Sequence, residues 1–191
     1  MIQQLTSSRW SHVFTTIVII AGMGVGFFLR DNALTEVRIY TDIQFGITAF
    51  YPAAWSVSSS TSYPFRARNL TERGFPTTIQ ITVQTVPDTI SPRQVFDTLS
   101  LERLQTLASY NVISSPVNIT LPDGSSASVV EYAYADSEAD PFLERIPSII
   151  RGQDVVTIRR GQAITISFLS DEKTYDANLS TFEEFLQRLR L

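Results

Sequence analysis

The sequence predicts one α+β domain with a largely antiparallel sheet, preceded by a single apolar N-terminal helix. Three observations carry this prediction. Residues 13–29 contain no charged side chain, and residues 77–86 alternate apolar and polar side chains with the period of a strand. Capping sequences that start with serine introduce helical patterns at residues 91 and 180. Strand patterns, one helix, more strands and a terminal helix suit an antiparallel sheet rather than alternating β–α units.

Length and composition limit the classes of function. The 191 residues suffice for one anchor and one domain with a hydrophobic core. Hydrophobic residues make up 43% of the chain, which argues against disorder, and the net charge of -4 offers no basic surface for nucleic acid. Cysteine is absent, and the only histidine, His12, lies beside the apolar segment. We therefore expect a protein that is not an enzyme, with no catalytic, cofactor or metal site.

Residues 13–30 are predicted to form a transmembrane helix that follows a short tail at 1–12. The uncharged run VFTTIVIIAGMGVGFFL would span roughly 25 Å as a helix, slightly less than a ~30 Å hydrocarbon core. Trp10 and Arg30 suit the two interfaces, where amphipathic groups extend the reach of a helix. The alternatives are a cleaved signal peptide, which Asp31 near the best cleavage position argues against, and a buried core helix.

Small residues within this helix predict a face for packing against another helix. Gly22 and Gly26 form a G-x-x-x-G pattern, and Ala21 adds small surface beside them. The alternative is that glycine is simply frequent in membrane helices. Arg9 before the helix and Arg30 after it nearly balance, so the positive-inside rule leaves the orientation open. The likeness to a signal anchor favours a single-pass protein in the lipid bilayer with its soluble domain on the extracytoplasmic, periplasmic side.

Alternating side chains predict the strands of the domain. In residues 77–86, isoleucine and valine alternate with glutamine and threonine, so one face is apolar and the other polar. Pro52 ends the alternating run that begins at Phe45, and the turn at Pro122 opens a long strand. In chain order, we expect a linker with a first strand at 31–44, strands at 45–51 and 55–59, a long loop or flap at 58–76, a strand at 77–86, an extended stretch at 111–120, a strand ending near 135, and strands at 154–160 and 162–169.

Two N-capping sequences predict the helices. At residues 91–94, Ser-Pro-Arg-Gln places serine at the N-cap, proline at the first helical position and glutamine where it completes a capping box. The helix that follows is expected to end near Tyr110. At residues 180–183, Ser-Thr-Phe-Glu begins a terminal helix with an apolar stripe that includes Phe182 and Phe185.

The order of several short motifs adds a family resemblance. The motifs are the opening with Phe45, Tyr51, Pro52 and Trp55, the strand from Ile79 to Val83, the helix start at Ser91, the strand from Asp123 to Tyr132, and the terminal trio Tyr175, Phe182 and Phe185. Together they resemble PsbP-like domains over residues 45–191, the predicted soluble domain. The resemblance implies the Mog1/PsbP fold, an antiparallel sheet packed between helices. It also implies a non-catalytic accessory role on the extracytoplasmic face of photosynthetic or other membrane complexes. Chloroplast members have histidine-containing sites that this chain lacks, so a manganese or calcium role is not implied.

Arginine and aromatic residues gather in the predicted flap. Arg66, Arg68 and Arg73 lie among Tyr63 and Phe65, and this combination is favoured at the centre of protein interfaces. We therefore predict that these five residues form a partner-docking surface. The alternative is an ordinary solvated loop whose aromatic side chains pack into the core.

Carboxylates offer no further site from their spacing. Asp136, Glu138 and Asp140 alternate like part of a calcium loop, but the glycine and the distal glutamate of an EF-hand are missing. A solvated acidic loop is the better interpretation, with a weak cation or partner contact as the alternative. Glu131 lies in an otherwise apolar strand, where it is either a buried acid or, as we expect, a solvent-facing residue.

These observations leave competing hypotheses for function. The leading one is an accessory subunit of a membrane-embedded photosynthetic or respiratory electron-transfer complex, with integral membrane subunits as partners. The alternative is a membrane-tethered extracytoplasmic module that binds a small ligand or lipid between sheet and flap. A third hypothesis is an enzyme that uses only carboxylates, tyrosine and arginine.

Overall fold

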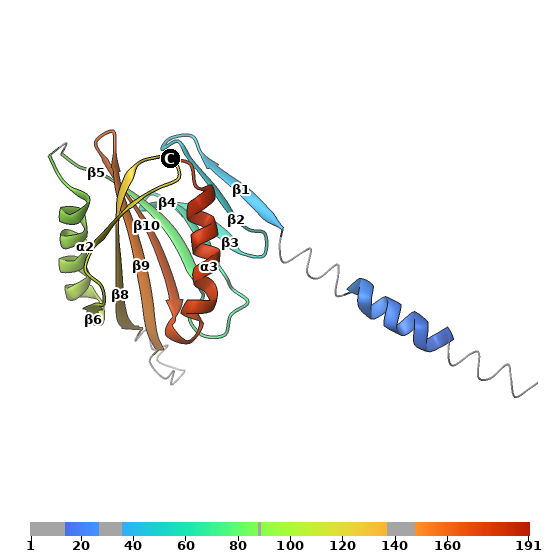
Figure 1. Ribbon diagram of the computed structural model, residues 1–191. Helices are drawn as coiled ribbons and strands as arrows, with labels where there is room; N and C mark the ends of the chain where they lie inside the picture. Colours follow the sequence, from blue (N-terminus) through green and yellow to red (C-terminus); the bar gives the residue numbers. More distant parts are fainter. Residues whose placement is uncertain (1–13, 27–35, 88, 137–147) are drawn as a thin grey trace, which may run out of the picture. The chain divides into compact units, whose positions relative to one another are not determined.

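The computed structural model shown in Figure 1 describes residues 14–26, 36–87, 89–136 and 148–191. The contacts of the chain divide it into two compact units. The first consists of Met1–Val37 with Pro52–Ala54, and the second of Arg38–Tyr51 with Trp55–Leu191.

The first unit contains a helix at residues 14–26, whose side chains are all exposed. Over the described part of the chain, no helix has the length and apolar character needed to cross a membrane. Residues 13 and 27–30, which complete the predicted transmembrane helix, lie outside the described residues, so that helix stays a prediction. A methyl group added at Gly22 or Gly26 would meet no atom within 4 Å. The packing role of these glycines and of Ala21 likewise stays a prediction.

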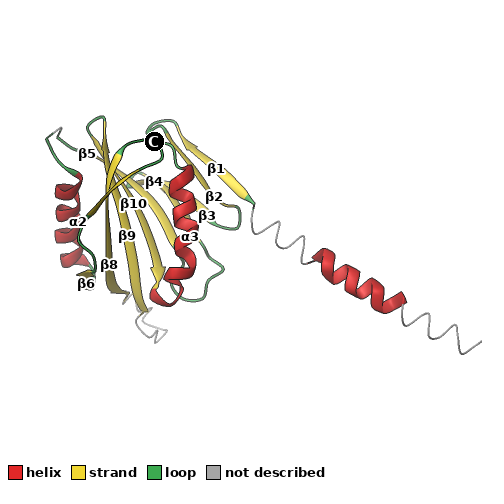
Figure 2. Ribbon diagram, viewed as in Figure 1, coloured by secondary structure: helices red, strands yellow, loops and turns green. Residues whose placement is uncertain are grey.

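The second unit holds the sheet and two helices (Figure 2). Its elements are β1 (Val37–Asp42), β2 (Ile47–Pro52), β3 (Ser56–Ser60), β4 (Tyr63–Arg68), β5 (Thr78–Thr85), α2 (Pro92–Thr106), β6 (Ala108–Val112), β7 (Val117–Thr120), β8 (Ser126–Asp136), β9 (Ser148–Arg159), β10 (Gln162–Asp171) and α3 (Glu172–Arg188).

The main sheet has the strand order β3-β4-β5-β10-β9-β8-β6, with β7 also paired to β8. Neighbouring strands in it run antiparallel throughout the described residues. A separate two-stranded sheet is formed by β1 and β2. The predicted α+β class with an antiparallel sheet is therefore confirmed.

The two helices cover opposite faces of the sheet. Successive residues of a strand point to opposite faces, and on β9 Val155 belongs to the large core under α3 while Val156 belongs to a smaller core under α2. The large core joins Phe182 and Phe185 of α3 to the strands, and the rings of Phe168 and Phe182 stack with centroids 5.0 Å apart. The predicted arrangement of a sheet between helices is thus confirmed.

The capping prediction at Ser91 is confirmed in detail. The Ser91 hydroxyl accepts the backbone N–H of Gln94, and the Gln94 side chain accepts the backbone N–H of Ser91, which makes a capping box. The helix ends at Thr106, earlier than predicted, because Leu107 adopts an extended conformation and β6 begins at Ala108.

Other element boundaries also differ from the predicted ones, and β9, for example, begins at Ser148 rather than at residue 154. The proposed flap at 58–76 contains most of β3 and all of β4, because its serines pair with β4 and its alternating Tyr63–Arg68 sequence pairs with β5. The terminal helix begins at Glu172 rather than at residue 180, because Asp171 caps it by accepting the backbone N–H of Lys173.

Candidate functional site

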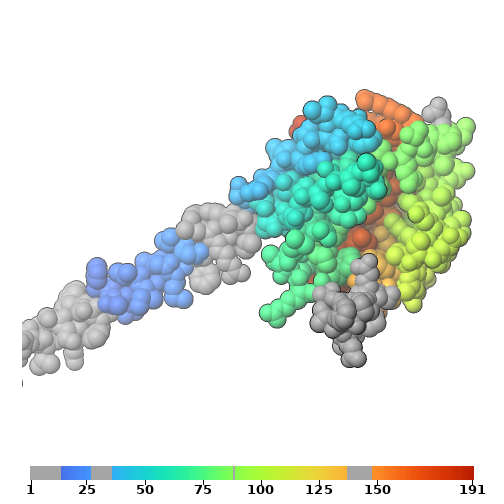
Figure 3. Space-filling view, turned by 180° about the vertical axis from the view of Figure 1, so that it is seen from behind, coloured from blue at the N-terminus to red at the C-terminus, as the bar shows by residue number. Residues whose placement is uncertain are grey.

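A hollow lies on the α2 side of the sheet, between β4 and the C-terminal end of α2. Figure 3 shows it between the strands coloured teal and green and the yellow-green segment, with orange and red strands at its floor. Its volume is about 470 Å³. We call it the arginine trough, lined by Arg66, Arg68, Gly74, Phe75, Pro76, Thr78, Gln80, Thr106, Leu107, Ala108, Tyr134, Ala135, Asp136 and Leu169.

The alternation of β4 places two arginines in this trough. Arg66 and Arg68 are two residues apart, so they point to the same face of the strand. Phe65 and Ala67 point to the other face, where both are fully buried in the core under α3. The burial of two apolar residues therefore fixes the face on which the cationic pair appears.

Arg66 is held in one orientation by its neighbours. Its Nε donates a hydrogen bond of 2.7 Å to Oε1 of Gln80, which lies directly opposite it on β5. Its guanidinium carbon lies 3.8 Å from the centre of the Tyr63 ring. Hydrogen bonding to Ser58 lowers the pKa of Tyr63, and the charges of Arg66 and Arg68 act in the same direction. Among the residues that the structure describes, neither arginine forms an ion pair with a carboxylate.

The remaining walls of the trough differ in character. Phe75, Leu107 and Leu169 provide apolar surface, whereas Tyr134 and Asp136 on β8 form a polar wall opposite β4. Positive charge is therefore concentrated on the β4 side of the trough, and Asp136, the one carboxylate among the described lining residues, lies on the β8 side.

A second hollow lies on the outer side of α2. It has a volume of about 520 Å³ and is lined by Arg93, Phe96, Asp97, Ser100, Leu101, Leu104, Val112, Ile113, Ser114, Ser115 and Pro116. We call it the apolar groove, because Leu101 is 63% exposed, Leu104 58% and Ile113 50%. The C-terminal turns of α2 separate it from the arginine trough, since Leu104 lines one hollow and Thr106 and Leu107 line the other. Large apolar side chains exposed together are a mark of interaction surfaces.

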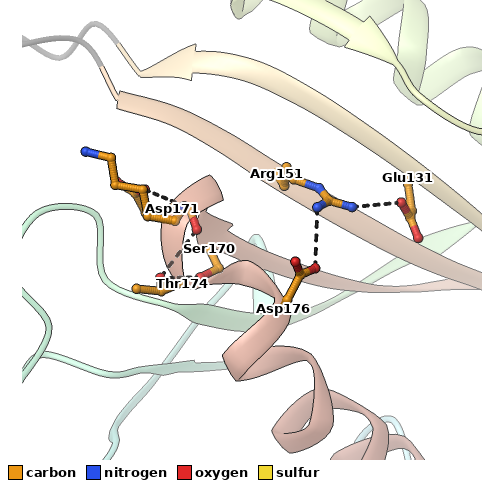
Figure 4. Close-up of polar contacts among 7 residues, drawn as sticks. Glu131, Arg151, Ser170, Asp171, Thr174 and Asp176 are labelled. Atoms are coloured by element: carbon orange, nitrogen blue, oxygen red, sulfur yellow. Dashed lines mark hydrogen bonds and ion pairs between the residues drawn. The ribbon is translucent and has the colours of Figure 1, made fainter.

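The α3 side of the sheet carries a charged cluster, drawn in Figure 4. The guanidinium of Arg151 lies 3.3 Å from Glu131 and 3.5 Å from Asp176, and it stacks 4.0 Å above the ring of Tyr175. Glu131 is thus neither a buried acid nor a free solvent-facing residue, because it forms part of an ion-paired cluster that links β8, β9 and α3. Its geometry explains how α3 is attached to the sheet.

Tyr175 provides a test of this packing. Its hydroxyl is buried without a hydrogen-bond partner among the described residues, and burial raises its pKa to about 12. The neutral phenol therefore contributes stability that is present below about pH 10 and is lost as the pH rises towards the pKa of Tyr175 in the folded protein.

We expect Tyr175→Phe to leave the free energy of unfolding unchanged or raised by about 1 kcal/mol at neutral pH. Denaturant titrations at neutral and alkaline pH will check this, and the advantage of the variant should widen above about pH 10. A marked loss of stability at neutral pH would show that the hydroxyl has a partner.

A buried polar network lies between α2 and the sheet. Nη1 of Arg103 lies 2.5 Å from Oδ2 of Asp154, whose side chain is fully buried, and the Tyr132 hydroxyl donates to Oδ1 of the same carboxylate at 3.2 Å. Burial opposes the charged form of Arg103, but the charge of Asp154, together with Tyr132 and the hydrogen bonds to Asp154 and Tyr110, raises the pKa of the arginine. Because every polar atom named here has a partner, this network supports the fold and is not exposed to a ligand. Sequence reasoning missed it, since only the isolated Asp154 within an apolar strand could have signalled it.

The predicted docking residues fall in different places. Arg66 and Arg68 line the arginine trough with Tyr63 beside them, while Arg73 is exposed in the loop before β5 and does not line it. The prediction is wrong for Phe65, which is fully buried in the core because it faces inward on β4.

Of the predicted acidic loop, Asp136 ends β8 and lines the arginine trough. Glu138 and Asp140 lie outside the described residues. In the part of the chain that the structure describes, no three acidic, histidine or cysteine side chains are grouped so that they could hold a metal ion.

Solved structures share this architecture. The solution structure of cyanobacterial PsbP (CyanoP) from Synechocystis sp. PCC 6803 superposes with a TM-score of 0.59 over 81% of this chain and 92% of that chain, at 16% identity. LpqN of Mycobacterium tuberculosis gives a TM-score of 0.55 over 81% and 89%, at 15% identity. The Ran-binding protein Mog1p of Saccharomyces cerevisiae gives 0.51 over 81% and 95%, at 11% identity.

The chain has the Mog1/PsbP-like fold. No protein-family model matches the sequence, and no curated protein matches it. The identities to these structures are low, so the likeness concerns the fold alone. The predicted fold is therefore confirmed. Evidence about function has to come from the surfaces of this PsbP-like domain itself.

Proposed function

We propose that this chain is a non-catalytic accessory subunit of a membrane-embedded photosynthetic or respiratory electron-transfer complex. The apolar segment at 13–30 anchors it in the bilayer, and its PsbP-like domain braces integral membrane subunits on the extracytoplasmic side. The observation that carries the proposal is the pair of neighbouring hollows beside the C-terminal turns of α2, one cationic and one apolar.

The chemistry of the two hollows suits a protein interface. Arginine beside an aromatic ring is typical of interface residues that contribute most to binding, and exposed leucines supply apolar area around them. Arg66 is already fixed by Gln80 and Tyr63, so its immobilisation on binding costs little entropy. A partner that covers both hollows would bury charged and apolar groups together, as interfaces of accessory subunits do.

The solved structures of similar fold are consistent with such a role without defining it. CyanoP is a cyanobacterial PsbP, LpqN is involved in cell envelope biogenesis, and Mog1p binds Ran. Binding to another protein is thus one use of this fold, and a part in cell envelope biogenesis is another. Both uses support a docking role for the present domain.

The arginine pair gives the first test. We expect the double variant Arg66→Ser, Arg68→Ser to lose about 90% or more of the partner that co-purifies with the full chain in mild detergent, because truncating central arginines typically costs ≥2 kcal/mol of binding. Arg188→Ser is the matched control, since Arg188 is an exposed arginine on α3, which covers the opposite face of the sheet. Quantitative mass spectrometry of the purified material measures the loss. Equal losses in both variants would place the docking surface elsewhere.

The anchor gives the second test. We expect Gly22→Leu with Gly26→Leu to release the protein from its complex while it stays in the membrane fraction, because leucine would fill the groove that lets another helix approach. Leucine keeps the segment apolar, so insertion itself is preserved. Unchanged co-purification of this variant would reduce the segment to a plain anchor.

One observation favours the alternative function. The arginine trough has a volume of about 470 Å³, which lies within the range of small-molecule sites. A membrane-tethered module that binds a small anionic ligand or lipid would use the same arginines. Native mass spectrometry of the detergent-extracted chain separates the two functions, because a bound small molecule adds a discrete mass that a docking surface does not.

A further inference from the structure

We propose that the arginine trough receives an extended acidic segment of the partner protein, with carboxylates at alternate positions facing β4. This inference rests on the proposed docking function and names the chemistry of the segment that docks. Three features support it: the spacing of the two arginines, the absence of ion pairs between them and the described carboxylates, and the lining of the trough.

The spacing of the arginines fits an extended ligand. Arg66 and Arg68 are two residues apart on one strand, so their Cα atoms are about 6.6 Å apart and their side chains leave the same face. Two acidic residues separated by one residue in an extended segment have the same separation and also share a face. A segment that runs along β4 can therefore place one carboxylate on each guanidinium. In a helix, residues two apart point in different directions and cannot do so.

The two guanidiniums have unused hydrogen-bonding capacity. Arg66 uses its Nε on Gln80, and its two terminal nitrogens remain available. Arg68 is exposed and forms no ion pair within the described residues. Other arginines are placed differently, since Arg103 and Arg151 both lie against carboxylates. A carboxylate on each trough arginine would complete the charge-assisted pairs that the fold leaves open.

The charge around the trough sets the position of the segment. Arg66 and Arg68 both line the β4 side, so the acidic side chains of the segment lie on that side. Phe75 and Leu169 offer apolar surface between the two walls, which suits an apolar side chain of the same segment. The trough thus favours a segment that combines two acids with an apolar residue.

Binding of synthetic peptides to the full chain in lipid nanodiscs tests the inference. The probe is a blocked, fluorescent heptapeptide with aspartate at its third and fifth positions, leucine at its seventh, and glycine or serine elsewhere. We expect its affinity to fall about tenfold or more when both aspartates become asparagine, and by a similar factor in Arg66→Gln, Arg68→Gln. The Arg188→Gln variant should bind as the unmodified chain does. Unchanged thermal unfolding of the double variant will show that it remains folded.

Three results would overturn the inference. They are equal binding of the asparagine peptide, no effect of the double arginine variant, and binding of inorganic phosphate in the trough with no binding of the aspartate peptide. The last result would make the trough a site for a small anion. Loss of co-purification in the arginine variants without peptide binding would refute the acidic segment and leave the docking function standing. If the peptide binds but the arginine variants still co-purify with the partner as the unmodified chain does, the docking function is refuted instead.

Discussion

Replacing Asp154 with alanine is expected to lower the free energy of unfolding by about 3–5 kcal/mol, because it leaves a buried arginine without its counter-ion. The Asp154 side chain is fully buried, and the side chain of Arg103 is only 17% exposed. The same substitution removes the acceptor of the Tyr132 hydroxyl, which is itself buried. Both donors would then lose their shared acceptor in a largely buried environment, and an unsatisfied buried donor is costly. Chemical denaturation monitored by circular dichroism measures the change.

Two further variants separate the charge from the packing. Arg103→Met with Asp154→Leu removes both charges together, and we expect it to recover much of the stability lost in the single variant, since an apolar pair of similar volume needs no counter-ion. Asp154→Asn keeps the size of the side chain and should fall between the wild type and alanine. A loss below about 1 kcal/mol in Asp154→Ala would show that water reaches the site and compensates the arginine.

Gly152→Ala is expected to destabilise the domain by about 3 kcal/mol through overpacking. A Cβ atom built on Gly152 would lie 2.3 Å from Cζ of Tyr132 and 2.5 Å from Cε2, far inside van der Waals contact. Tyr132 lies directly opposite Gly152 on β8, and its ring crosses over the glycine towards Asp154. The ring cannot move away easily, because it also packs against Tyr110 and beneath the guanidinium of Arg103.

A double-mutant cycle tests this steric explanation. Tyr132→Leu shortens the side chain that the new methyl group would strike, so Gly152→Ala should cost much less in that background than in the wild type. Urea denaturation of the four proteins gives the coupling energy. Additive losses would mean that glycine is needed at position 152 for a reason other than the Tyr132 ring.

The sequence predicted those parts of the fold that rest on local patterns. The Ser91 capping box and the alternating residues of β5 each depend on neighbours within a few positions, and both occur as expected. The order of the short motifs, through their resemblance to PsbP-like domains, indicated the Mog1/PsbP-like fold. The start of α3 was missed because Asp171 caps it as effectively as a serine, and the stronger serine pattern at residue 180 lies inside the helix.

Features that depend on distant parts of the chain could not be predicted. The trough brings β4 residues together with Tyr134 and the end of α2, a juxtaposition set by the strand order. The apolar groove escaped notice for a related reason, because the sequence of this helix does not show which side Leu101 and Leu104 face. In the structure they face outward, and only Val95 and Phe96 of α2 are buried.

The central claim is that this chain works as a bilayer-anchored subunit of a larger complex. Extraction of native membranes in mild detergent, followed by native electrophoresis and mass spectrometry of the band that contains the full-length chain, tests it most directly. We expect the chain in the membrane fraction, in a band of far higher mass than the monomer, together with integral membrane subunits in a fixed ratio. Recovery of the chain from the aqueous fraction, or as a lone monomer in detergent, would contradict the account.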